Sequence, residues 1–227
     1  MSKHHTINVK CPECGHEIPF TIWDSVNVDL DPEAKERIFN GDLFLCSCPE
    51  CGIQFYYAYG FLYHDMSRKL MIYFQFNEPD EGKYDTSNLP AFCLDGYTLR
   101  VIYGNRRLVE KIMMFDSGLD DIAVERMKYM VSHFECPEIF RDGEELYFCG
   151  WEPAEDPGRD KNIFGEIFFR KIDKNGNSEE FTFEMESYYE HAKATEIDPR
   201  MKADKWECVD QGWMDMKLRC NRNQLIQ

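Results

Sequence analysis

The sequence lacks an excess of basic residues. Its 42 acidic residues outnumber its 26 basic ones, which gives a formal net charge of −16. Residues 1–76 are acidic on their own, with six Lys and Arg against ten Asp and Glu. A negative molecule repels the phosphate backbone, so this composition argues against nucleic acid as a partner.

Long apolar segments are also missing. The longest apolar run, Phe55 to Tyr63, is too short to span a bilayer. The first residues, Met1-Ser2-Lys3-His4-His5, lead towards the first cysteines without the apolar stretch of a signal peptide. We therefore expect no membrane association and a cytoplasmic protein. In a reducing cytosol, paired cysteines more often bind metal than form disulfides.

Familiar catalytic motifs are absent too. The sequence has no nucleophile elbow, phosphate-binding glycine loop, dinucleotide fingerprint or His-Glu-x-x-His helix. This weakens an enzymatic interpretation without excluding one, because catalytic groups often converge only in space. His64 and Asp65 are adjacent and could poise an imidazole for a hydrolase, although turn chemistry alone accounts for Asp65.

What the sequence does contain is one pentapeptide written twice, as Cys11-Pro12-Glu13-Cys14-Gly15 and Cys48-Pro49-Glu50-Cys51-Gly52. We call these the first and second knuckle. Two residues between paired cysteines let a short turn aim both sulfurs at one ion. Proline fixes φ at about −65°, and glycine allows a positive φ where the chain curls back. Four thiolates around one ion make a closed structural zinc site. The sequence therefore predicts one structural Zn²⁺ per chain, bound by Cys11, Cys14, Cys48 and Cys51.

The gap between the knuckles is long for such a site. It spans 33 residues from Cys14 to Cys48, about twice the gap of a usual zinc ribbon. Doubling a loop costs only about 0.6 kcal/mol of closure entropy, against roughly 10–16 kcal/mol of apparent zinc binding. The spacing is therefore no objection to the site.

Two alternatives for the cysteines stay open. A Cys-Pro-x-Cys pair at a helix N-terminus can act as a thiol-disulfide oxidoreductase, but neither knuckle is followed by a helical pattern. Cys46 lies two residues before Cys48, points the same way along a strand and is a candidate secondary ligand together with His64 and Asp65. A small buried side chain is the plainer interpretation of Cys46.

The pattern of apolar residues predicts an α+β protein whose N-terminal half is a zinc ribbon. Asp31-Pro32-Glu33 favours a helix start and Gly41 a stop, so a helix over residues 32–40 is inserted between the knuckles. An extended aromatic β-hairpin follows the second knuckle, with its turn at His64 to Lys69. The expected strands are Thr6 to Lys10, His16 to Trp23, Asp42 to Ser47, Ile53 to Tyr63, Leu70 to Phe76 and Thr98 to Tyr103.

A helical pair is expected to complete the N-terminal half, and the C-terminal part is expected to be a small antiparallel sheet with helical flanks. Apolar stripes predict one helix around Leu108 to Phe115 and a second over Leu119 to Met130. We place a boundary near residue 135, which gives a domain over residues 1–135 and another over 136–227. Residues 77–92 are expected to be a loop or hinge and residues 151–161 an exposed loop, while Trp206 to Leu218 is ambiguous. The expected later elements are strands at Leu146 to Trp151, Ile163 to Arg170 and Glu180 to Glu186, and a helix at Ser187 to Glu196.

The knuckles, the intervening helix and the run Phe61-Leu62-Tyr63-His64-Asp65-Met66 together resemble the CpXC domain of bacteria and archaea. The resemblance covers roughly residues 6 to 135, and Cys11, Cys14, Cys48 and Cys51 occupy its four motif positions. It implies no established activity. We therefore expect a non-catalytic binding or scaffold module with a protein partner, and leave self-association open.

Overall fold

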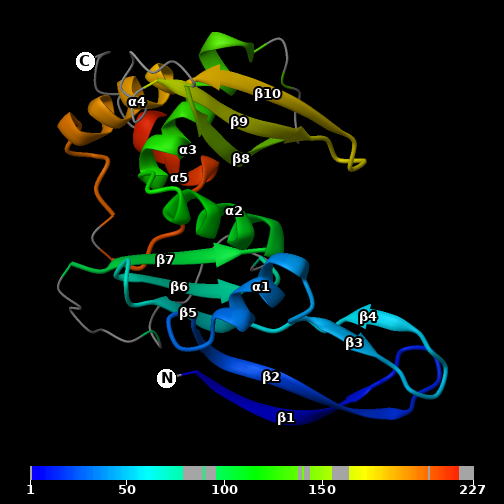
Figure 1. Cartoon of the computed structure of the whole chain (residues 1–227). Helices are drawn as coiled ribbons and strands as arrows, with labels where there is room; N and C mark the ends of the chain where they lie inside the picture. Colours follow the sequence, from blue (N-terminus) through cyan, green and yellow to red (C-terminus); the bar gives the residue numbers. More distant parts are fainter. Residues whose placement is uncertain are drawn as a thin grey trace. The chain divides into compact units, whose positions relative to one another are not determined.

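The computed structural model describes residues 2–78, 89, 96–137, 140, 144–154, 164–203 and 205–219. It is a mixed α+β structure, with five α-helices, one π-helical turn and three sheets in these residues (Figure 1). The chain forms two compact units. Unit 1 contains Met1–Val109 and Asp204–Glu207, and unit 2 contains Glu110–Ala203 and Cys208–Gln227.

Unit 1 is built on a five-stranded sheet with the strand order β1-β2-β5-β6-β7. β1 (Lys3–Lys10) and β2 (Glu17–Asn27) pair antiparallel, as do β5 (Phe61–Asp65) and β6 (Leu70–Gln75). β2 joins β5 in parallel, and β7 (Thr98–Tyr103) joins β6 in parallel. β5 and β6 alternate buried and half-buried residues, so one face of the sheet forms the core.

A helix and a short hairpin lie between β2 and β5. α1 (Pro32–Asn40) begins with proline at its first turn and ends at Gly41, whose φ of +78° is left-handed, as the sequence predicts. β3 (Leu45–Ser47) and β4 (Gln54–Tyr56) flank the second knuckle and pair antiparallel. Just before β3, the Phe44 ring lies 5.3–6.1 Å from the centroids of four other aromatic rings, those of Tyr59, Phe61, Phe74 and Phe76.

Three of the predicted element boundaries in this region are wrong. The segment from Asp42 to Ser47 is a strand only over β3, because residues 42–44 form a turn. The single strand expected over Ile53 to Tyr63 is interrupted at residues 57–60 and becomes β4 and β5. The hairpin turn occupies residues 66–69, so His64 and Asp65 belong to β5.

Unit 2 contains a three-stranded antiparallel sheet with the order β10-β9-β8. Its strands are β8 (Glu145–Pro153), β9 (Gly165–Ile172) and β10 (Ser178–Glu184), which match the three expected strands within a few residues. In the turn between β9 and β10, the Gly176 amide donates to the Asp173 carbonyl. The predicted exposed loop at 151–161 and the hinge at 77–92 fall largely outside the described residues.

The helices of unit 2 bury their apolar stripes. They are α2 (Asn105–Asp116), which crosses from unit 1, α3 (Asp121–Met130) with the π-helical turn Val131–Glu135, α4 (Met185–Ile197) and α5 (Gln211–Arg219). Met114, Ala123 and Met127 pack with Phe148 and Phe169 of the sheet in one cluster. A second cluster joins α3 to α5 through Tyr129, Val209, Trp213 and Met214.

The boundary between the two compact units falls within α2, between Val109 and Glu110. The reason is that the helical pair shares its apolar core with the C-terminal sheet. The division into domains 1–135 and 136–227 concerns independent folding and stays a prediction. In the part of the chain that the structure describes, every helix is too short or too polar to cross a membrane.

Candidate metal centre

Both knuckles fold into the same tight turn. The Gly15 amide donates to the Cys11 carbonyl at 3.0 Å, and the Gly52 amide donates to the Cys48 carbonyl at 3.0 Å. The amide of each first cysteine donates to the carbonyl five residues later, at 2.8 and 2.9 Å. Gly15 and Gly52 have φ values of +72° and +75°, and a Cβ at either would meet nothing within 4 Å. Backbone conformation, and not lack of space, is therefore what favours glycine here.

The two turns bring four sulfur atoms together. The Sγ atoms of Cys11, Cys14, Cys48 and Cys51 all lie within 4.8 Å of one another. Each knuckle faces the other through pairs at 3.6 Å, Cys11 to Cys51 and Cys14 to Cys48. Zn–S bonds of about 2.3 Å in a tetrahedron place sulfurs about 3.8 Å apart, so the donor set fits one metal ion. A disulfide needs about 2.05 Å, and all four cysteines are free.

Because the four thiols lie close together, their pKa values differ, and that of Cys11 is lowered while that of Cys51 is raised. Hydrogen bonds to the thiolate, first from the Cys14 amide, lower the pKa of Cys11 to about 6. At Cys51 the Ile53 amide also favours the thiolate, but desolvation and the neighbouring thiols outweigh it and raise the pKa to about 12. Deprotonation of one thiol in the group is therefore favourable, but each further thiolate is repelled by the first. A bound cation would relieve this repulsion.

Cys46 packs next to the four clustered cysteines but is not one of the cluster. It is 2% exposed and packs with Cys11, Ile18 and Cys48 in a small apolar cluster. Burial raises the pKa of the Cys46 thiol. This environment fits a small buried side chain, and the four-sulfur group found in the described residues does not include it.

The elements that follow the knuckles bear on the redox alternative. β2 begins at Glu17 after the first knuckle, and β4 begins at Gln54 after the second. A redox Cys-Pro-x-Cys pair depends on a helix N-terminus, which lowers the pKa of its first thiol. Neither knuckle opens a helix, so the fold offers no such support for an oxidoreductase.

His64 and Asp65 have separate partners. They are adjacent on β5, where successive side chains point to opposite faces of the sheet. The His64 Nδ1 lies 3.5 Å from Asn27 Nδ2, and its Nε2 lies 3.2 Å from the Tyr97 hydroxyl. The buried Asp65 carboxylate accepts from the Arg68 amide and guanidinium, both at 2.9 Å. Asp65 therefore holds the hairpin turn and does not orient the imidazole.

Sequence reasoning missed a group of charged side chains inside unit 2. Lys128 Nζ lies 2.8 Å from Glu110 Oε1, and Lys111 Nζ lies 3.2 Å from a carboxylate oxygen of Asp121. The signal was present, since these residues interrupt the apolar stripes of α2 and α3. We call the group the buried ionic cluster. Its five residues are each 2–4% exposed, and they are Glu110, Lys111, Asp121, Glu125 and Lys128.

The fold and this cysteine group define an α+β protein with a closed four-cysteine candidate metal centre. The chain belongs to the CpXC protein family, whose model matches residues 9–128 and so includes both knuckles. This confirms the resemblance seen in the sequence. No curated protein and no solved structure matches the chain.

Proposed function

We propose that the chain is a non-catalytic binding or scaffold module whose first unit is held together by one structural Zn²⁺. The observation that carries this proposal is the convergence of Cys11, Cys14, Cys48 and Cys51 within 4.8 Å from two separate segments. Four thiolates fill a tetrahedral zinc shell and leave no position for a substrate. Bound zinc supplies folding energy by tying the β1–β2 turn to the β3–β4 hairpin.

The proposed partner is another protein. The net charge of −16 opposes binding to nucleic acid, and a reducing compartment such as the cytosol keeps knuckle thiols available for metal. Because iron also accepts four thiolates, the identity of the metal is part of the proposal and needs a direct measurement.

The first test is elemental analysis of the full chain purified without chelator. We expect one zinc per chain. Cys14→Ser and Cys51→Ser should each lose the zinc, because a hydroxyl is a poor replacement for a thiolate. Both side chains are exposed, so these variants test ligation rather than packing. Apparent zinc binding of roughly 10–16 kcal/mol exceeds the stability of most domains, so unit 1 should unfold in both variants.

Cys46→Ala is the matched control. It removes a buried thiol next to the site, and should keep a full zinc equivalent while losing about 1–2 kcal/mol of packing. Full zinc in either serine variant would show that the ligand assignment is wrong. Metal-free protein with two disulfides that form and break at mild potentials would instead support the oxidoreductase.

A further inference from the structure

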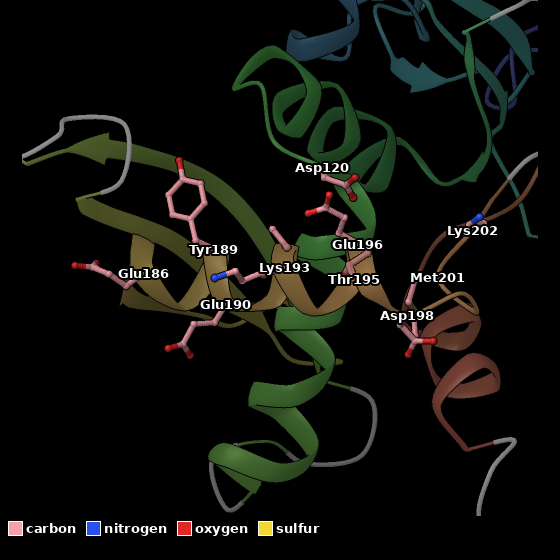
Figure 2. Close-up of a pocket in the computed structure, with 11 residues that line it drawn as sticks. Asp120, Glu186, Tyr189, Glu190, Lys193, Thr195, Glu196, Asp198, Met201 and Lys202 are labelled. Carbon is pink, nitrogen blue, oxygen red and sulfur yellow. The ribbon is translucent and has the colours of Figure 1, made fainter.

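A groove of about 930 Å³ runs along α4 in unit 2 (Figure 2). α4 forms one wall, and Asp120 at the start of α3 and the segment 198–202 complete it. Tyr189 and Met201 add apolar surface. A volume of this size suits a peptide segment or a medium-sized organic ligand.

The lining of the groove carries a net negative charge. It contains five carboxylates and two lysines, Lys193 and Lys202. Of the carboxylates, Asp198 pairs with Arg200, and Asp120 caps α3 by accepting from two backbone amides. Figure 2 labels Glu196 on α4 and Asp120 at the start of α3 among the residues that line the groove. Within the described residues, Glu190 and Glu196 form no ion pair with a lysine or arginine. The five carboxylates belong to Asp120, Glu186, Glu190, Glu196 and Asp198.

Two polar atoms in the lining are buried without a hydrogen-bond partner in the described part of the chain. They are Oγ1 of Thr195, a residue only 8% exposed, and Oε2 of Glu186. Native proteins satisfy nearly all such buried atoms. Each of these oxygens can accept a hydrogen bond, so the pair indicates a ligand that brings N–H groups into the groove.

The carboxylates are spread out rather than focused on one point. Glu186 and Glu196 are ten residues apart on α4, which is about 15 Å of helix. A single metal ion cannot contact charges over that length. An elongated ligand with several positive charges can, and the apolar surface of Tyr189 favours one that also carries apolar groups.

We propose that this groove docks a basic, partly apolar peptide segment of a partner protein. Its lysine or arginine side chains pair with Glu190 and Glu196, its apolar side chains lie against Tyr189 and Met201, and its N–H groups satisfy Thr195 and Glu186. The inference rests on the proposed function only in taking the partner to be a protein.

The test is fluorescence anisotropy with the full chain and a labelled twelve-residue peptide of alternating Lys and Leu. We expect saturable binding that weakens with salt, and none to the same peptide with Glu in place of Lys. Glu190→Gln with Glu196→Gln should weaken binding roughly 2- to 30-fold, the worth of two exposed ion pairs. The matched control is Glu152→Gln with Glu166→Gln, two exposed acids on β8 and β9 of the same unit, which should leave the affinity unchanged.

Thr195→Val separates a binding role from a structural one. The hydroxyl has no partner in the described chain, so its removal should leave the Tm unchanged or raise it, while the peptide affinity falls. Equal effects of the two glutamine pairs, no binding at all, or spermidine binding as tightly as the peptide would each overturn the proposal. Zinc content measured on the same preparation keeps the two proposals apart, since the groove lies in unit 2 and the zinc site in unit 1.

Discussion

His191 lies on α4 with 12% of its side chain exposed. Burial lowers the pKa of its imidazole, the positive charge of Arg126 lowers it further, and Glu190 opposes them. Because the pKa in the folded state is below that of the unfolded chain, protonation favours unfolding. The contribution of His191 to stability is therefore complete above about pH 6.5 and is lost as the pH falls through the folded-state pKa.

His191→Gln should flatten this part of the pH profile. Uptake of one proton changes the slope of the unfolding free energy against pH by at most about 1.4 kcal/mol per pH unit. The slopes of the variant and the parent should therefore differ by no more than this amount. Urea unfolding of both proteins at a series of pH values between about 8 and 5 measures the difference. Parallel profiles would show that His191 takes up its proton equally in both states.

The sequence predicted the residues whose structural role depends only on their neighbours along the chain. The knuckle glycines and cysteines act within five residues of one another, and their turns form as the pattern indicates. The partners of His64 could not be predicted in this way. Asn27 and Tyr97 lie 37 and 33 residues away in the chain, and only the strand pairing brings them to the imidazole.

At the scale of elements, α1 could be predicted from local sequence signals, whereas the strands after it depend on contacts with distant segments. Pro32 and Gly41 bound α1, and the prediction is correct because both signals are local. The expected strand over Ile53 to Tyr63 fails near Gly60, where a Cβ would lie 2.6 Å from the Phe74 carbonyl oxygen. That close approach of the segment before β5 to β6 is a tertiary constraint, and a single glycine was its only trace in the sequence.

The buried ionic cluster joins three elements of unit 2. Lys111 Nζ lies 3.2 Å from Glu125 Oε1 and donates to the Val209 carbonyl at 2.8 Å. Gln211, at the start of α5, donates to Glu125 Oε2 at 2.7 Å. Burial opposes the charge of Glu125, but Lys128 and Lys111 outweigh it and lower the pKa of the carboxyl. α2, α3 and the approach to α5 therefore depend on one set of charges.

Lys111→Met should destabilise unit 2 by about 3–5 kcal/mol, because it leaves buried carboxylates without their counter-charge and the Val209 carbonyl without its donor. Urea unfolding of the parent and the variant gives the value. Lys174→Met, at an exposed position in the β9–β10 turn, is the control and should change stability by no more than about 0.5 kcal/mol. Equal stabilities for the two variants would mean that the cluster contributes nothing net.

At the scale of the whole molecule, different interactions stabilise the two units. Unit 1 has a large aromatic core, but its knuckles pack only a small apolar cluster around Ile18 and Cys46. Unit 2 has two apolar clusters and the buried ionic cluster, and the four-sulfur group lies entirely outside it. Removing the proposed metal with a strong chelator should therefore unfold unit 1 and leave the β8–β9–β10 sheet folded.

Hydrogen exchange measured by mass spectrometry tests this prediction through α3. This helix belongs to the first predicted domain, residues 1–135, but to compact unit 2. If the domains are 1–135 and 136–227, α3 should lose protection together with β1 and β2 when the metal is removed. If stability follows the compact units, α3 should keep its protection, since its side chains are buried against the C-terminal sheet and α5. We expect the second result. Loss of protection in α3 at the same chelator concentration as in β2 would show that the candidate metal centre stabilises residues well beyond unit 1.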